Sequence, residues 1–165
     1  MKRLLLITFS LLLFCTACAK DGTREKIHAG LTPPLEFDCS FILGELDGRA
    51  HVKLDENSVA FGITDGALKG LVAHATAEGT RLTYEGIDVS FSPKTTEKFT
   101  RIQKLFAFLR EQDYNPNTAT LVPAGETYTF TDEDATVELT VNPETKEFVK
   151  LHLKQGDEVL TLTIE

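Results

Sequence analysis

The chain has 165 residues, of which 42% are hydrophobic, and its 25 acidic and 17 basic residues give a formal net charge of −8 at pH 7. This length suits one ordinary domain that can bury a core without disulfide bonds. The acidic balance excludes nucleic acid as an expected partner, because an acidic surface repels a phosphate backbone.

The N-terminal segment has the pattern of an export signal. Lys2 and Arg3 form a short positive head, and an apolar run follows from Leu4 to Phe14. This run is shorter than the stretch of about 20 apolar residues that spans a bilayer, and its flanks are those of a signal peptide. We therefore expect residues 1–17 to be a signal peptide that is removed during export.

The end of this segment, Thr16-Ala17-Cys18, resembles a bacterial lipobox, in which the cysteine is acylated, with palmitate among its acyl chains, and the chain is cut just before it. Cys18 would then anchor an extracytoplasmic protein to a cell membrane or cell envelope. The alternative is cleavage after Ala19, since Ala17-Cys18-Ala19 has a small-x-small pattern, and it would release a secreted protein. Without residues 1–17, which contain two of the basic residues, 148 residues remain with a formal charge of −10.

Residues 18–34 are expected to be a lipidated tether, because they show no apolar period and end in two prolines. From residue 35 onward, apolar residues recur at every second position, which predicts β-strands. Turn residues separate these short strands, as is typical of an antiparallel meander. The predicted strands are 35–41, 49–54, 59–64, 72–77, 80–85, 87–91, 127–130, 136–141, 148–154 and 159–164.

One helix is predicted near residues 93–112, between the two groups of strands. Ser92 and Pro93 suit its start as N-cap and first helical residue. Apolar residues at three- and four-residue spacing mark one face: Phe99, Ile102, Leu105, Phe106 and Leu109. Residues 113–125 are expected to form a loop.

These elements together define the predicted fold class. It is mainly β (α+β), a curved antiparallel meander sheet, or half-barrel, packed on one main amphipathic helix. The elements form a single domain over residues 35–165.

No recognisable motif for catalysis or metal binding follows the signal segment. There is no Gly-x-Ser-x-Gly turn and no phosphate-binding glycine loop. Cys39 alternates in phase with Phe37 and Phe41, which predicts a buried thiol. The histidines lack metal-ligand spacing: His28, His51, His74 and His152. We therefore expect no cofactor, no metal and no enzymatic activity; a hydrolase whose residues meet only after folding stays open as an alternative.

Phenylalanine is the abundant apolar residue of the expected domain. Nine of the 11 phenylalanines follow the signal segment, mostly on predicted inner faces of strands or on the helix stripe. A closed core would use all of them for packing, whereas a half-open sheet under a helix would present some of them to an apolar cavity. The candidate cavity residues are Phe61, Phe91, Phe99, Ile102, Phe106, Leu109 and Phe130.

The order of the elements, with several local segments, resembles the LolA/LolB-like lipoprotein carrier fold over about residues 35–165. The segments are Leu68-Lys69-Gly70-Leu71, Leu82-Thr83-Tyr84-Glu85-Gly86-Ile87, Tyr128-Thr129-Phe130 and the strand 137–141 that runs into Asn142-Pro143-Glu144-Thr145. Members of that family wrap a curved sheet around helices to make a hydrophobic cavity for acyl chains. The resemblance implies a lipid or acyl ligand. A structural or regulatory module that binds an envelope protein is the alternative.

Overall fold

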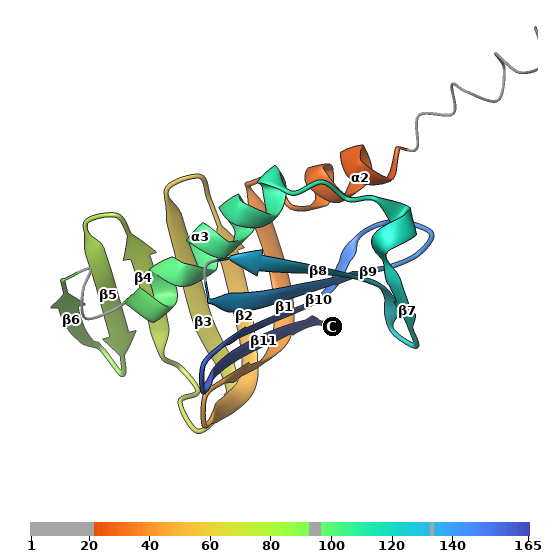
Figure 1. Cartoon of the computed structure of the whole chain (residues 1–165). Helices are drawn as coiled ribbons and strands as arrows, with labels where there is room; N and C mark the ends of the chain where they lie inside the picture. Colours follow the sequence, from red (N-terminus) through yellow and green to blue (C-terminus); the bar gives the residue numbers. More distant parts are fainter. Residues whose placement is uncertain (1–21, 93–96, 133) are drawn as a thin grey trace, which may run out of the picture.

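The computed structural model describes residues 22–92, 97–132 and 134–165 (Figure 1). The expected signal peptide, Cys18 and residues 93–96 at the expected helix start lie outside the described residues. The strands are β1 (Leu35–Leu43), β2 (Leu46–Leu54), β3 (Ser58–Gly66), β4 (Val72–Thr76), β5 (Gly79–Tyr84), β6 (Ile87–Phe91), β7 (Thr120–Val122), β8 (Gly125–Asp132), β9 (Ala135–Val141), β10 (Phe148–Gln155) and β11 (Glu158–Ile164). The helices are α2 (Thr23–Gly30), α3 (Glu97–Glu111) and the 3-10 turn η1 (Pro116–Thr118).

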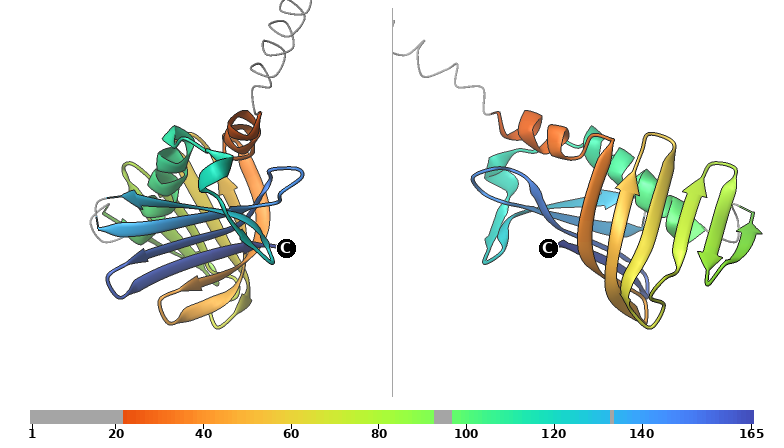
Figure 2. Two further views of the ribbon diagram at one scale, coloured as in Figure 1. Left: turned by 45° about the vertical axis from the view of Figure 1, so that its right-hand side comes forward. Right: turned by 180° about the vertical axis from the view of Figure 1, so that it is seen from behind.

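The eleven strands of the described residues belong to one antiparallel sheet that is built from two meanders. β1 to β6 form the first meander and β7 to β11 form the second, and the two join where β1 pairs with β11. In this pairing Cys39 lies opposite Ile164, and Leu43 lies opposite Leu160. The sheet curls without closing, so that β6 and β7 are its two edges (Figure 2). This is the curved antiparallel half-barrel that the sequence predicts.

Helix α3 lies across the concave side of the sheet (Figure 1). It runs between β6 and β7 in the chain, and these strands form opposite edges of the sheet. The connection therefore has to pass over one face, and an apolar helix face favours the concave one, where it is removed from water. Four apolar residues on this face are buried: Ile102, Leu105, Phe106 and Leu109.

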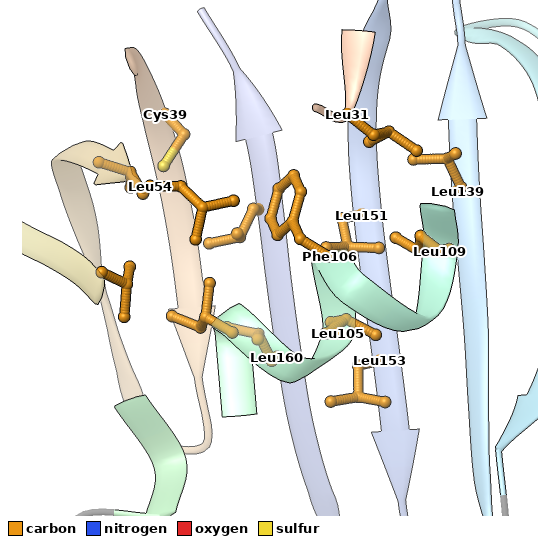
Figure 3. Packing of buried hydrophobic residues seen from close by; sticks show 14 of the residues in the cluster. Leu31, Cys39, Leu54, Leu105, Phe106, Leu109, Leu139, Leu151, Leu153 and Leu160 are labelled. Carbon is orange, nitrogen blue, oxygen red and sulfur yellow. The ribbon is translucent and has the colours of Figure 1, made fainter. Parts of the chain in front are cut away.

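Phe106 is the central side chain of the contact between helix and sheet (Figure 3). Its ring centroid lies 6.2 Å from that of Phe37 and 5.8 Å from that of Phe148. Phe37 and Phe148 also meet each other edge to face at 5.6 Å, so the three rings form one cluster. Such aromatic pairs add stability beyond the area that they bury.

Cys39 lies in the core on β1, as its phase with Phe37 and Phe41 predicts. Burial raises the pKa of its thiol to about 12, and the charges of Glu165 and Asp38 act in the same direction. The thiol is therefore protonated at neutral pH, which suits a packing residue and not a nucleophile.

Helix α2 was not expected, because it lies within the segment interpreted as a tether. In the described part of this segment, two apolar residues are buried against the body, Ile27 and Leu31. Two apolar residues are too few to show a helical period in the sequence. His28 Nε2 donates a hydrogen bond to the carbonyl of Gln112 at 3.1 Å, and Arg24 lies 3.5 Å from Asp113. The chain from residue 22 onward is therefore attached to the body.

Strand β7 and the turn η1 lie in residues 113–125, which the sequence predicts to be a loop. β7 is only three residues long and pairs with the first residues of β8. Gly125 makes this hairpin possible, because its φ is +146° and a Cβ there would lie 2.1 Å from the carbonyl oxygen of Val141. Within the described residues, no helix is long and apolar enough to cross a membrane.

Replacing Phe106 with alanine should destabilise the fold strongly. The change leaves a cavity under α3 and removes both ring contacts, so we expect a loss of about 3–5 kcal/mol in the free energy of unfolding. Urea denaturation measures this loss. Lys104→Ala, at an exposed position of the same helix, is the matched control and should change stability by less than about 0.5 kcal/mol. Equal effects of the two changes would contradict the packing described here.

Candidate functional site

The seven candidate cavity residues divide into three groups. Four are buried in the packed interior between α3 and the sheet: Phe61, Ile102, Phe106 and Leu109. Phe91 on β6 and Phe130 on β8 are half-buried. Phe99 belongs to the first turn of α3, and its side chain lies outside the described residues.

Ring contacts fill the interior around several of these residues. Phe61 meets Phe41 edge to face with centroids 5.1 Å apart. Phe130 lies 5.4 Å from the ring of Tyr114 and 6.4 Å from that of Phe108. The concave side is therefore packed core at these positions.

The apolar concave surface continues past this core onto β5 and β6. The register places Phe61 opposite Ala73, Ala73 opposite Leu82, and Leu82 opposite Val89. Since directly opposite residues share a face of the sheet, Val89 and its alternate neighbours Ile87 and Phe91 lie on the same face as the buried core.

This part of the concave surface is open to solvent. Ile87 is 65% exposed, Val89 is 43% exposed and Tyr84 is 37% exposed. Leu82 and Phe91 beside them are half-buried. We call these five residues the open apolar end. Neighbouring exposed apolar side chains of this kind mark candidate sites for apolar ligands or protein partners.

Of the open apolar end, the sequence predicts only Phe91 as a cavity residue. The alternation of Ile87, Val89 and Phe91 was visible as a strand pattern. The sequence does not show that these side chains are exposed, because their exposure depends on how many strands α3 covers. The structure shows α3 packed on β3 and β4, in the middle of the first meander.

A small groove lies at the junction of α3 with the turn between β2 and β3. Leu54 and Phe106 form its apolar floor, and Lys104 and Arg110 lie on its helix side. Its volume is about 190 Å³, which is below the range of about 300–1,000 Å³ that is usual for ligand pockets. Gln103 Nε2 donates a hydrogen bond across it to the Glu56 carbonyl at 2.8 Å.

A larger groove of about 420 Å³ lies on the opposite, outer face of the sheet. Its floor is polar and is formed by Thr127, Thr129, Glu138, Thr140, Lys150 and His152. The β7–β8 hairpin makes its wall with Val122, Pro123 and Ala124. The groove therefore joins a polar floor to an apolar rim. We call it the outer groove.

A charged cluster lies farther along the outer face on β1 and β2. His51 donates from Nδ1 to Asp38 at 2.8 Å and from Nε2 to Glu36 at 3.0 Å. Lys53 lies 2.9 Å from the same Glu36 oxygen. The hydrogen bond to Asp38, and then that to Glu36, raises the pKa of His51 above its ordinary value. Lys53 is the main cause of the lowered pKa of Glu36.

In the part of the chain that the structure describes, no group of three or more histidine, cysteine or acidic side chains could hold a metal ion. The cluster of His51 with its two carboxylates is an ion-pair network on the surface. It has no serine or cysteine nucleophile among the partners given above, so it offers no support to the hydrolase alternative.

No family model matches the sequence, and no curated protein matches it. Among solved structures, the chain is similar to the Mycobacterium tuberculosis lipoprotein LppX, with 10% identity, 89% of this chain and 95% of that chain covered, and a TM-score of 0.46. It is also similar to LprF from Mycobacterium bovis, with 9% identity, coverage of 87% and 91%, and a TM-score of 0.43. A LolA superfamily protein from Nitrosomonas europaea has 13% identity, coverage of 87% and 90%, and a TM-score of 0.41.

These neighbours include the superfamily that the order of the elements resembles. The likeness concerns the fold alone.

The His51 cluster predicts a pH-dependent part of the stability. Folding raises the pKa of His51, so the protonated ring stabilises the fold. This contribution to the free energy of unfolding is complete below the ordinary pKa of about 6.5 and is lost as pH rises through the higher folded value. Urea denaturation at about pH 5.5 and pH 8 measures this. The free energy of unfolding should change less between the two pH values in His51→Gln than in the wild type. His74→Gln, at an exposed position on β4, is the control. The prediction fails if the two variants respond alike.

Proposed function

We propose that this protein is a non-catalytic, extracytoplasmic lipoprotein that is anchored through Cys18 and binds an apolar ligand, a lipid or an acyl chain, on the concave side of its half-barrel. The observation that carries the proposal is the open apolar end. There, Tyr84, Ile87 and Val89 lie exposed on the face that forms the packed core elsewhere. The lipobox-like Thr16-Ala17-Cys18 supports the anchor.

An acyl chain suits this surface for a physical reason. Each methylene group that leaves water contributes about 0.8 kcal/mol, and the open apolar end offers adjacent side chains on two paired strands to receive several of them. Of the candidate residues, Phe91 belongs to this surface, and Phe61 lies on the same face of the sheet two strands away, across Ala73 from Leu82. The first turn of α3, which contains Phe99, lies at the same end of the molecule (Figure 1).

The remaining candidates have a supporting role in this proposal. Ile102, Phe106 and Leu109 hold α3 on the sheet, and Phe130 packs against Tyr114. The ligand therefore enters from the β6 end and stops at the packed interior. A ligand held only at an open surface exchanges readily with solvent, which suits reversible binding.

The second candidate function is a structural or regulatory module that binds an envelope protein. The observation in its favour is the position of β6, a five-residue edge strand that carries Ile87 and Val89 exposed. An edge strand of this kind can pair with a strand of a partner, with apolar side chains adding to the backbone hydrogen bonds. The two functions differ in one observable, which is binding of an acyl probe in the absence of any protein partner.

If Cys18 is the anchor, replacing it should move the protein out of the membrane fraction. With wild-type Cys18, the protein should collect in the membrane fraction, and mass spectrometry should find acyl groups on an N-terminus at residue 18. Cys18→Ala should release the protein into the soluble fraction or leave it unprocessed, because no thiol remains to accept the lipid. An unmodified wild-type N-terminus at Lys20 would instead show ordinary secretion.

If the ligand binds at the open apolar end, a charge on the inner face of β6 should weaken binding, and a charge on the outer face should not. Val89→Asp places a charge on the open apolar end and should weaken binding of a neutral fluorescent acyl probe by about ten-fold or more, equal to about 1.4 kcal/mol. Ser90→Asp adds the same charge to the next, exposed residue on the opposite face and should leave binding nearly unchanged. Fluorescence titration measures both. Absence of binding in the wild type would favour the partner-binding module.

A further inference from the structure

The tip of the β7–β8 hairpin is apolar and exposed. Leu121 is 78% exposed, the largest value among the exposed large hydrophobic residues that the structure describes, and Val122 is 39% exposed. Pro123 and Ala124 complete the turn and are also exposed. We call these four residues the hairpin tip. A single exposed leucine is ordinary on a protein surface, whereas four consecutive apolar residues at a projecting turn need an explanation.

The β7–β8 hairpin lies at the same end of the long axis of the molecule as the start of α2, opposite β6, and its tip points away from α2 across that end (Figure 1). The view from behind shows the same arrangement (Figure 2). Helix α2 is held on the body by its buried Ile27 and by the contacts of His28 and Arg24. The chain therefore leaves the body at a fixed place.

The length of chain between this place and Cys18 is short. Four residue steps separate Cys18 from Gly22, and an extended chain covers at most about 3.6 Å per residue, or about 14 Å in all. A lipid on Cys18 would thus hold this end of the body against the bilayer surface. A long flexible tether would have allowed every orientation, but the docking of α2 removes that freedom.

We propose that the hairpin tip inserts into the interface of the membrane on which the protein is anchored, so that the open apolar end faces away from that membrane. The occupant of this surface is a lipid bilayer. The inference rests on the anchoring part of the proposed function and adds an orientation and a second membrane contact to it.

The outer groove behind the tip supports this orientation. Val122, Pro123 and Ala124 belong to both features, and the groove floor directly behind them carries Lys150, His152, Glu138 and three threonines. An apolar tip followed by a polar, mixed-charge surface matches the change from acyl chains to headgroups across a bilayer interface. The expected mature charge of −10 disfavours strongly anionic lipids, so neutral phosphatidylcholine is the appropriate probe.

The absence of tryptophan from the sequence allows a direct test. In Leu121→Trp, the new indole is the only one in the protein, and indole emission reports transfer from water into an interface. The matched control is Ser90→Trp, which places an indole at an exposed position of β6 at the opposite end of the molecule, on the face of the sheet that does not carry the open apolar end. Each variant is purified with its natural N-terminus, checked by mass spectrometry and reconstituted into phosphatidylcholine vesicles with or without brominated acyl chains.

The expected result is a blue shift and strong quenching by brominated lipid in Leu121→Trp, with little change in Ser90→Trp. A vesicle-bound Leu121→Trp protein whose emission ignores the brominated lipid would overturn the proposal and leave the anchor intact. Quenching of Ser90→Trp alone would also overturn it, because the β6 end would then face the bilayer. A protein without acyl groups that washes off the vesicles would instead reject the anchor, and the orientation with it.

Discussion

The packing of α3 on the concave side of the sheet is the contact on which the rest of the structure depends. Two meanders meet at β1 and β11, so the chain that joins them has to pass between opposite edges of the sheet. The apolar face around Phe106 and Leu109 places this connection over the core. Without the helix, the inner face of a curved eleven-stranded sheet would lie in water, which is unfavourable in proportion to its apolar area.

The same contact divides the concave surface into two parts. Where α3 packs, aromatic rings such as Phe37, Phe106 and Phe148 fill the interior. On β5 and β6 the apolar face continues, with Ile87 and Val89 exposed. In such a half-barrel, the core under α3 can stabilise the fold, while the open apolar end stays free for an apolar ligand or a partner. This separation explains how a chain of this size keeps a complete core and still offers an apolar surface.

The two ends of the molecule have different chemistry. The β6 end carries apolar residues on the inner face of the sheet, whereas the opposite end carries α2, the hairpin tip and the outer groove. Ile27 and Leu31 fix α2 on the body, so the proposed anchor at Cys18 would also set the direction in which the open apolar end points. Ligand binding and membrane attachment would then occupy opposite ends of the molecule. The open apolar end would face away from the anchoring membrane and stay accessible to other molecules.

The sequence by itself determined the alternation that makes each main strand amphipathic, the spacing of Ile102, Phe106 and Leu109 on one helical face, and therefore a curved sheet packed on one helix. These features are local, because a period of two or of 3.6 residues is set by backbone geometry alone. Helix α2 and strand β7 were missed because two apolar residues and a three-residue strand carry no period. Only the tertiary structure decided that Phe61 is packed while Val89 is exposed, since both residues show the same alternation. Burial depends on what lies over a residue, and the extent of the helix-covered core is a property of the whole fold.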